Sequence, residues 1–135
     1  MKRNYVVLMA MLLFAVVGFT GCSDDDEGGI SGNAEELLIG RWLGIWSEGY
    51  DIYVDGKKEW NESIASKGFY YTFNDDGTVE INGYPTHWEV SGNLLNIEGE
   101  NYTITTLNEN TLVLEYRESY EGGDYYEKNT FERVN

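Results

Sequence analysis

Cysteine and histidine each occur once in the 135-residue sequence, and basic residues are few. A single cysteine, Cys22, excludes an internal disulfide and leaves the region after it without a thiol nucleophile. A single imidazole, His87, gives catalysis little support, and the serines lack the context of a nucleophile motif. Nine Lys and Arg stand against 24 Asp and Glu. This balance excludes most nucleic-acid binding, because phosphates are neutralised by clustered basic side chains.

The N-terminal segment has the layout of a secretory signal. Lys2 and Arg3 give a positive start, and an apolar run of 15 residues extends from Tyr5 to Phe19. That run is shorter than the roughly 20 residues of a membrane-spanning helix. Small residues then precede Cys22, as in bacterial lipoproteins, which this segment resembles. The resemblance implies that residues 1–21 are a lipoprotein signal peptide and that Cys22 is the lipid attachment site, carrying acyl chains such as palmitate.

Two other interpretations of Cys22 remain open, namely an ordinary signal peptide cut nearby and an uncleaved anchor helix. In the lipoprotein interpretation, two or three acyl chains anchor the protein stably, at about 0.8 kcal/mol per buried methylene. No second membrane element is then needed. We expect a cell-envelope location, as an outer membrane lipoprotein.

Residues 22–33 form the lipidated cysteine and a tether. The segment after Cys22 reads SDDDEGGISGN, which has too few apolar side chains to order itself. Its eleven residues reach about 36 to 40 Å when stretched. The acidic cluster resembles a surface-export signal of some lipoproteins and is otherwise a solvated spacer. Without residues 1–21, seven basic residues face 24 acidic ones, a net charge of -17.

The remaining region, 34–135, is predicted to be a single all-β domain after one short helix. Asn33 is a plausible helix cap with Glu36 three residues later, and Gly40 is a stop. Beyond it, short runs rich in aromatic, Thr, Val and Ile residues alternate with turn clusters. We expect strands at 41–53, 60–73 with a break near 66–68, 78–82, 86–91, 94–97, 102–107, 111–117 and 125–134. Hairpin-sized links predict antiparallel neighbours, and such a meander hides its edges best as an eight-stranded up-and-down barrel.

Alternation along these strands predicts which side chains face inward. The expected inner face is aromatic and aliphatic, and the outer face is acidic and polar. The inner set is Trp42, Gly44, Trp46, Phe69, Tyr71, Phe73, Val79, Ile81, Trp88, Val90, Tyr102, Ile104, Leu112, Leu114, Tyr116, Phe131 and Arg133.

Residues 37–134 resemble the lipocalin-like domain of small bacterial lipoproteins. The similarity rests on Gly40-Arg41-Trp42 after a short helix, on the hairpin at 73–78, and on leucines in the late strands. It implies a barrel floor in which Gly40 and Trp42 match the Gly-x-Trp motif and Arg133 lies over the indole through a cation-π contact.

An eight-stranded barrel has room for its own side chains or for one small ligand. A solid aromatic core and a shallow mouth pocket are therefore both open. The aromatic residues expected to contact a ligand or partner are Trp46, Tyr50, Tyr53, Trp60, Tyr71, Trp88, Tyr116 and Tyr125.

We expect no enzyme activity, no cofactor and no metal. The segment 74–77 superficially resembles a calcium loop, but the remaining ligand spacing is missing, which favours a hairpin turn. Weak calcium binding around Glu118, Glu121 and Asp124 is an alternative to a solvated loop.

Two functional hypotheses follow. The first is a membrane-anchored module that holds a small apolar or amphipathic ligand, or a glycan, at the barrel mouth. The alternative is a filled barrel that acts as a scaffold for an envelope protein partner. A contiguous apolar cavity supports the first, and a packed interior with an exposed aromatic patch supports the second.

Overall fold

The computed structural model describes residues 29–134. The predicted signal peptide, Cys22 and the acidic cluster lie outside the described residues. The elements are β1 (Gly29–Ile30), α2 (Ala34–Leu38), β2 (Gly40–Tyr53), β3 (Gly56–Ser63), the 3-10 turn η2 (Ala65–Lys67), β4 (Tyr70–Phe73), β5 (Thr78–Ile81), β6 (Tyr84–Ser91), β7 (Leu94–Ile97), β8 (Glu100–Leu107), β9 (Thr111–Tyr120) and β10 (Gly123–Val134). No helix in this part of the chain is long and apolar enough to cross a membrane.

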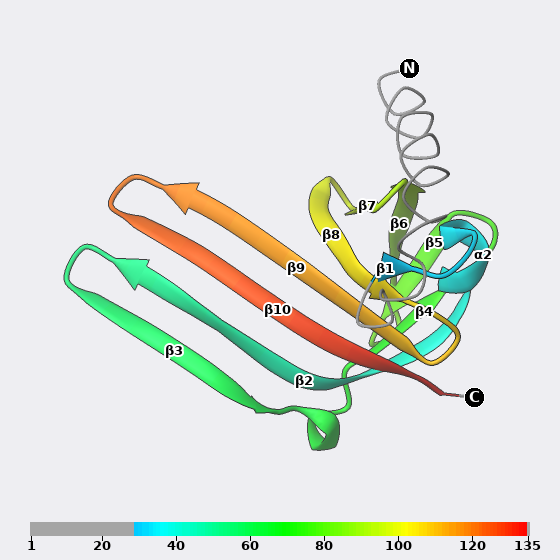
Figure 1. Ribbon diagram of the computed structural model, residues 1–135, viewed down its shortest axis with the longest axis horizontal. Helices are drawn as coiled ribbons and strands as arrows, with labels where there is room; N and C mark the ends of the chain where they lie inside the picture. Colours follow the sequence, from blue (N-terminus) through cyan, green and yellow to red (C-terminus); the bar gives the residue numbers. More distant parts are fainter. Residues whose placement is uncertain (1–28, 135) are drawn as a thin grey trace, which may run out of the picture.

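Eight antiparallel strands close into a barrel, which confirms the predicted fold class. Neighbours pair in the order β4, β5, β6, β7 and β8, and a β8–β9 pairing continues the circuit. The first and last barrel strands, β2 and β10, then pair from Val134 opposite Arg41 to Asp124 opposite Ile52. Figure 1 shows the barrel at the right and its long strands leaving it toward the left. Closure leaves the barrel itself without free strand edges.

The short helix forms where the sequence predicts it. The Asn33 side chain accepts a hydrogen bond from the backbone N–H of Glu36, 3.0 Å away, so it caps α2. Gly40 follows with a φ of 133°, a conformation that favours glycine. Leu38 is fully buried and so directs α2 against one end of the barrel.

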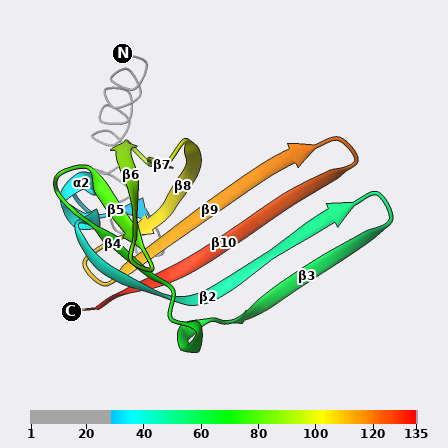
Figure 2. The ribbon, with the colours of Figure 1, turned by 180° about the vertical axis from the view of Figure 1, so that it is seen from behind.

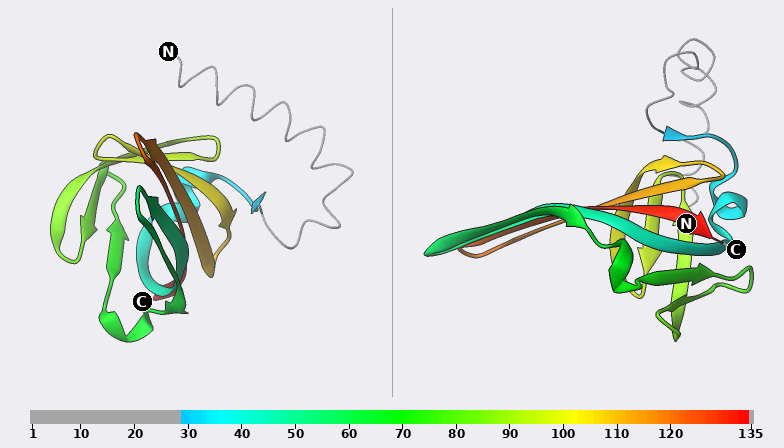
Figure 3. Two further views of the ribbon diagram at one scale, coloured as in Figure 1. Left: turned by 90° about the vertical axis from the view of Figure 1, so that its left-hand side faces the viewer. Right: turned by 90° about the horizontal axis from the view of Figure 1, so that it is seen from below.

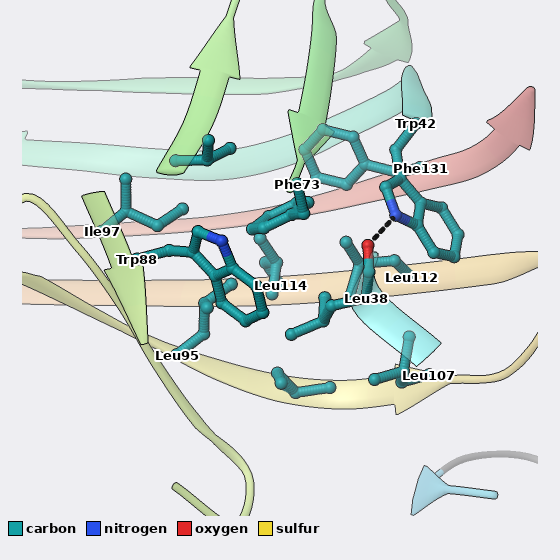
Figure 4. Close-up of a cluster of buried hydrophobic side chains, with 12 residues drawn as sticks. Leu38, Trp42, Phe73, Trp88, Leu95, Ile97, Leu107, Leu112, Leu114 and Phe131 are labelled. Carbon is teal, nitrogen blue, oxygen red and sulfur yellow. Dashed lines mark hydrogen bonds between the residues drawn. The ribbon is translucent and has the colours of Figure 1, made fainter. Parts of the chain in front are cut away.

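The barrel interior is filled by side chains. Each of the eight barrel strands contributes at least one buried residue, and α2 adds Leu38. The largest fully buried side chains are Trp42 and Phe73. The ring of Phe73 meets Trp88 edge-on at 5.2 Å between centroids. Figure 4 shows these rings interleaved with leucines from the opposite wall, so packing supplies the stability that no disulfide provides.

The barrel floor is built around Trp42. Its indole Nε1 donates to the carbonyl of Leu38 at 2.9 Å, the dashed line in Figure 4. The guanidinium carbon of Arg133 lies 4.3 Å from the indole centroid. Arg133 also donates to the carbonyls of Leu37, Ile39 and Glu109, so it joins the helix and the β8–β9 turn to the floor. This is the geometry that the Gly-x-Trp resemblance implies.

Four strands form a second feature that the sequence did not predict. Residues 46–53 of β2, 116–120 of β9 and 123–130 of β10 run beyond the barrel together with β3, in the order β3, β2, β10, β9. We call this four-stranded part the sheet extension. It projects from the barrel as one layer, seen from behind in Figure 2 and nearly edge-on in the right view of Figure 3.

The predicted strand at 60–73 is interrupted near residues 66–68, as expected, but its two parts are separate strands and the first begins four residues earlier. The chain forms β3 at Gly56–Ser63, then η2, then β4 at Tyr70–Phe73. The first half of β2 pairs with β4 in the barrel, and its second half pairs with β3 in the extension. β2 is therefore long enough to belong to both parts, and β3 lies outside the barrel.

Two inward assignments were wrong. The β2–β10 register shifts at the Thr130/Phe131 step, where Trp46 faces Thr130 but Gly44 faces Phe131. This bulge places one extra residue in β2 and reverses the alternation beyond it. Trp46 consequently leaves the inner set and is 41% exposed, and Phe69, which precedes β4, is 40% exposed.

Candidate functional site

The predicted contact residues separate into five places. Trp88 is buried in the core and donates its Nε1–H to the carbonyl of Asn74, so this position was wrong as a contact residue. Trp46 and Tyr50 lie on one face of the sheet extension, and Tyr53 lies at its tip. Trp60, Tyr116 and Tyr125 lie on the opposite face, and Tyr71 lies in the barrel next to Phe131, 4.8 Å away between ring centroids.

The face that carries Trp60 and Tyr125 continues the barrel interior, because Leu112, Leu114 and Tyr116 alternate along β9. We call it the mouth face. Its rings form a row that crosses the strands of the sheet. Successive ring centroids lie 5.9 Å apart from Trp60 to Tyr125, 6.1 Å to Tyr116 and 5.3 Å to Tyr102. This aromatic row links the barrel core to the outermost strand, β3.

Gly49 allows the row to reach β3. It lies opposite both Trp60 and Glu127 in the sheet register. A Cβ on Gly49 would lie 2.7 Å from Cζ2 of Trp60 and would also clash with the Tyr126 carbonyl. Glycine thus lets the indole lie across β2 toward Tyr125, and Ser47 fixes it by accepting its Nε1–H at 3.0 Å.

On this face, carboxylates accept hydrogen bonds from the tyrosine hydroxyls. Tyr125 donates to Glu127 at 2.5 Å, and Tyr116 donates to Glu100 at 2.7 Å. The amide of Asn129 also donates to Glu127, at 2.9 Å. Burial, followed by the bond to Glu127, raises the pKa of Tyr125, whereas the bond to Glu100 is the main cause of the raised pKa of Tyr116. The phenols therefore remain protonated and donate to these carboxylates.

Glu127 lies at the centre of the mouth face. Its sheet neighbours are Gly49 on β2 and Tyr116 on β9. Its negative charge is also among the causes that raise the pKa of Tyr71 and of Tyr102, after burial in both cases. The carboxylate thus acts on rings of the extension and on rings at the barrel mouth.

The other face, which we call the outer face, has a different arrangement. Tyr50 and Tyr126 pack with centroids 5.5 Å apart. Each has a cation nearby, with Arg117 at 4.3 Å from the Tyr126 centroid and Lys57 at 5.8 Å from that of Tyr50. Trp46 donates its Nε1–H to Asn61 at 2.7 Å.

Two surface depressions lie outside the barrel interior. One, of about 570 Å³, lies over β2, β4 and β5 between Arg41, Tyr70 and Glu80. The other, of about 440 Å³, lies on the extension between Tyr50, Glu59 and Tyr126. Neither is lined by the buried cluster of Figure 4.

The candidate calcium segments adopt other roles. Asp76 accepts from the backbone N–H and the hydroxyl of Thr78, at 3.0 and 2.6 Å, and these bonds lower the pKa of Asp76. They close a hairpin turn between β4 and β5. In the second segment, Asp124 accepts from Ser119 at 3.2 Å. Among residues 29–134, no group of three or more His, Cys, Asp or Glu side chains is arranged to hold a metal ion.

Sequence reasoning missed Tyr102, Gly49 and Glu127 as members of this surface. Alternation predicts Tyr102 on the inner face, and its contact with Tyr116 makes it part of the row. Tyr125, Glu127 and Asn129 alternate along β10 and so share one face, which was the available signal. Gly49 had no signal, because its role depends on a residue of β3 reaching over it.

A protein-family model described as a lipocalin-like domain matches residues 38–114, more than half of the chain. The match extends from the last residue of α2 into β9. No curated protein matches the chain.

Proposed function

Because the chain belongs to the lipocalin-like domain family, we propose that it is a non-catalytic recognition module whose filled barrel presents the mouth face to a protein partner. The barrel acts as a rigid scaffold, and the sheet extension carries the contact residues. Rigid aromatic anchors are the residues that dominate most protein interfaces.

The observation that supports this proposal most directly is the occupied interior. Trp42 and Phe73 are 0% and 1% exposed, and buried residues from every barrel strand meet them. A ligand deep in the barrel would have to displace this packing, at a cost of several kcal/mol. The half-buried rings of Trp60, Tyr116 and Tyr125 instead lie outside the core and are available at the surface.

We further propose that the protein acts in the cell envelope as an outer membrane lipoprotein held by acylated Cys22. The supporting features are the signal-like segment before Cys22 and the acidic, glycine-rich segment after it. The end of the predicted tether is ordered, because Gly29 and Ile30 pair with β8 as strand β1. On an acyl anchor, the part of the tether before β1 would let the domain stand off the membrane and meet an envelope protein.

A second candidate function is the binding of a small apolar or amphipathic molecule, or a glycan, at the mouth. It is favoured by one observation, the position of Tyr71 and Tyr102 beside the core at the start of the aromatic row. A flat ligand could stack there without entering the barrel.

Site-specific photocrosslinking distinguishes the two functions. A benzoylphenylalanine in place of Tyr125 lies on the mouth face, and one in place of the adjacent Tyr126 lies on the outer face of the same strand. In the source cells, we expect irradiation of the full-length Tyr125 variant to give a covalent adduct with a second protein. The Tyr126 variant should not give that adduct.

The docking proposal fails if the two variants give the same adducts or neither gives one. Native mass spectrometry of the full chain, extracted from its own source, then tests the second candidate. A small molecule bound one to one, and lost on replacement of Tyr102 by Ala, would establish ligand binding instead.

A further inference from the structure

Cations of this chain meet aromatic rings on the outer surface and at the barrel floor. In residues 29–134, Arg41 lies 4.2 Å from the Tyr70 centroid, and Arg117 lies 4.3 Å from that of Tyr126. Lys57 approaches Tyr50, and Arg133 covers Trp42. None of the cation-π contacts in this part of the chain involves the aromatic row of Trp60, Tyr125, Tyr116 and Tyr102.

Within the described chain, no ion pair involves Glu100, Glu118 or Glu127, the mouth-face carboxylates that accept from rings of the row. The ion pairs of residues 29–134 join Lys57 to Glu59 and, at the edge of the mouth face, Lys67 to Glu62, all with exposed side chains. Among residues 29–134, the hydrogen bonds to the half-buried Glu127 carboxylate come from Tyr125 and Asn129. Lys58, the basic residue whose register position is on this face, lies opposite Asp51.

Three donors of the aromatic row already have acceptors. The Tyr125 and Tyr116 hydroxyls donate to carboxylates, and the Trp60 Nε1–H donates to Ser47. A carboxylate offers about four acceptor positions, so acceptor capacity remains on Glu127. A group with donors alone fits this surface, and ammonium and guanidinium are the side-chain groups of that kind.

We propose that the aromatic row and Glu127 receive a lysine or arginine side chain from a basic segment of the partner protein. This inference rests on the proposed docking function and adds the chemistry of the partner. The incoming cation lies over the rings of Trp60 and Tyr125 and pairs with Glu127, as Arg117 lies over Tyr126 on the outer face. Over residues 29–134, 20 acidic residues against seven basic ones attract such a segment from a distance.

A peptide titration with charge-matched variants tests the inference. The probe is an acetylated, amidated peptide of four Gly-Lys repeats, added to the full acylated chain in neutral detergent and followed by calorimetry. Glu127→Gln removes one charge from the mouth face but keeps an oxygen to accept from Tyr125. Glu115→Gln removes the same charge from the outer face, where Glu115 lies opposite Lys128.

We expect Glu127→Gln to weaken binding about tenfold, the effect of losing one charge-assisted contact. Glu115→Gln should change the affinity by less than about twofold, since Glu115 lies on the outer face, away from the bound cation, and solvent and salt screen charges at a distance. Trp60→Leu, which keeps an apolar side chain but removes the indole, should weaken binding about fivefold. A peptide of four Gly-Glu repeats should not bind.

Equal effects of Glu127→Gln and Glu115→Gln would overturn the inference, because they would show that the peptide responds to the overall charge of the protein and not to a site at Glu127. Absence of binding to the wild-type chain, or tighter binding of a neutral oligosaccharide on the same rings, would also overturn it. If Glu127→Gln loses its near-ultraviolet circular dichroism, the variant has lost its tertiary packing. Glu118→Gln on the same face then replaces it in the comparison and should also weaken peptide binding.

The two proposals fail in different ways. A protein adduct at position 125 together with no discrimination between the glutamate variants would leave docking in place and reject the cationic segment. Loss of the adduct would reject docking itself. Where an adduct forms, peptide mapping identifies the crosslinked segment of the partner, which the inference expects to be basic.

Discussion

Trp42 shows how single residues hold this fold together. Its ring is fully buried, its Nε1–H is satisfied by Leu38, and one face is covered by Arg133. Gly40 is required because it lacks a side chain, since a Cβ there would clash with the Arg133 guanidinium. The short helix, the first strand and the last strand therefore depend on one indole.

Replacing Trp42 by Ala should lower the free energy of unfolding by about 3–5 kcal/mol, the usual cost of removing a large buried aromatic side chain. Tyr84, which is 78% exposed on β6, is the control, and Tyr84→Ala should cost well under about 1 kcal/mol. Guanidinium titration of both variants measures the difference. Similar losses would contradict the assignment of Trp42 to the structural centre.

At the scale of elements, β2 and β10 are each shared between barrel and extension. The bulge opposite the Thr130/Phe131 step marks the transition, since it changes which β2 side chains face inward. Beyond it, both faces of the sheet are open to solvent. There the strands are packed through contacts between aromatic rings on each face and not through a buried core. The extension is held by cross-strand aromatic contacts, of about 0.5–1.5 kcal/mol each beyond burial.

A substitution at Gly49 tests whether the sheet extension can be destabilised separately from the barrel. Gly49→Ala should destabilise the protein by about 1–3 kcal/mol through overpacking, because the new methyl group meets Trp60 and the β10 backbone. The damage should be confined to the extension, with faster amide exchange in β3 while the barrel amides stay protected. Glu48→Ala, one residue away on the outer face, is the control. Uniform loss of protection across the barrel would contradict this separation of the two parts.

At the scale of the whole molecule, the extension and the tether decide how the domain is presented. The charge is strongly negative after the signal-like segment, which disfavours close contact with anionic lipid headgroups. The acyl anchor proposed at Cys22 would supply attachment without requiring such contact. The mouth face would then remain open to the proposed partner.

Replacing Cys22 by Ala should abolish incorporation of radiolabelled palmitate and release the protein from the membrane fraction, because the acylated sulfur is lost. Ser23→Ala, which keeps the cysteine, is the control and should remain labelled. Continued labelling of the Cys22→Ala variant would contradict the lipid attachment.

The alternation of apolar residues and the short turn clusters were enough to predict an all-β barrel, and Asn33, Glu36 and Gly40 were enough to predict the helix. These features are local, because strand period and helix capping are properties of neighbouring residues. The inner positions of Trp42, Phe73 and Phe131 followed for the same reason.

The sheet extension was decided only in three dimensions. A bulge of one residue in β2 moved Trp46 to the outer face, and no local pattern marks such a register shift. The grouping of Trp60, Tyr125 and Tyr116 around Glu127 depends on pairing between strands far apart in the chain. Sequence thus determined the barrel, through local periodicity, whereas the tertiary structure decided the candidate surface, through long-range register.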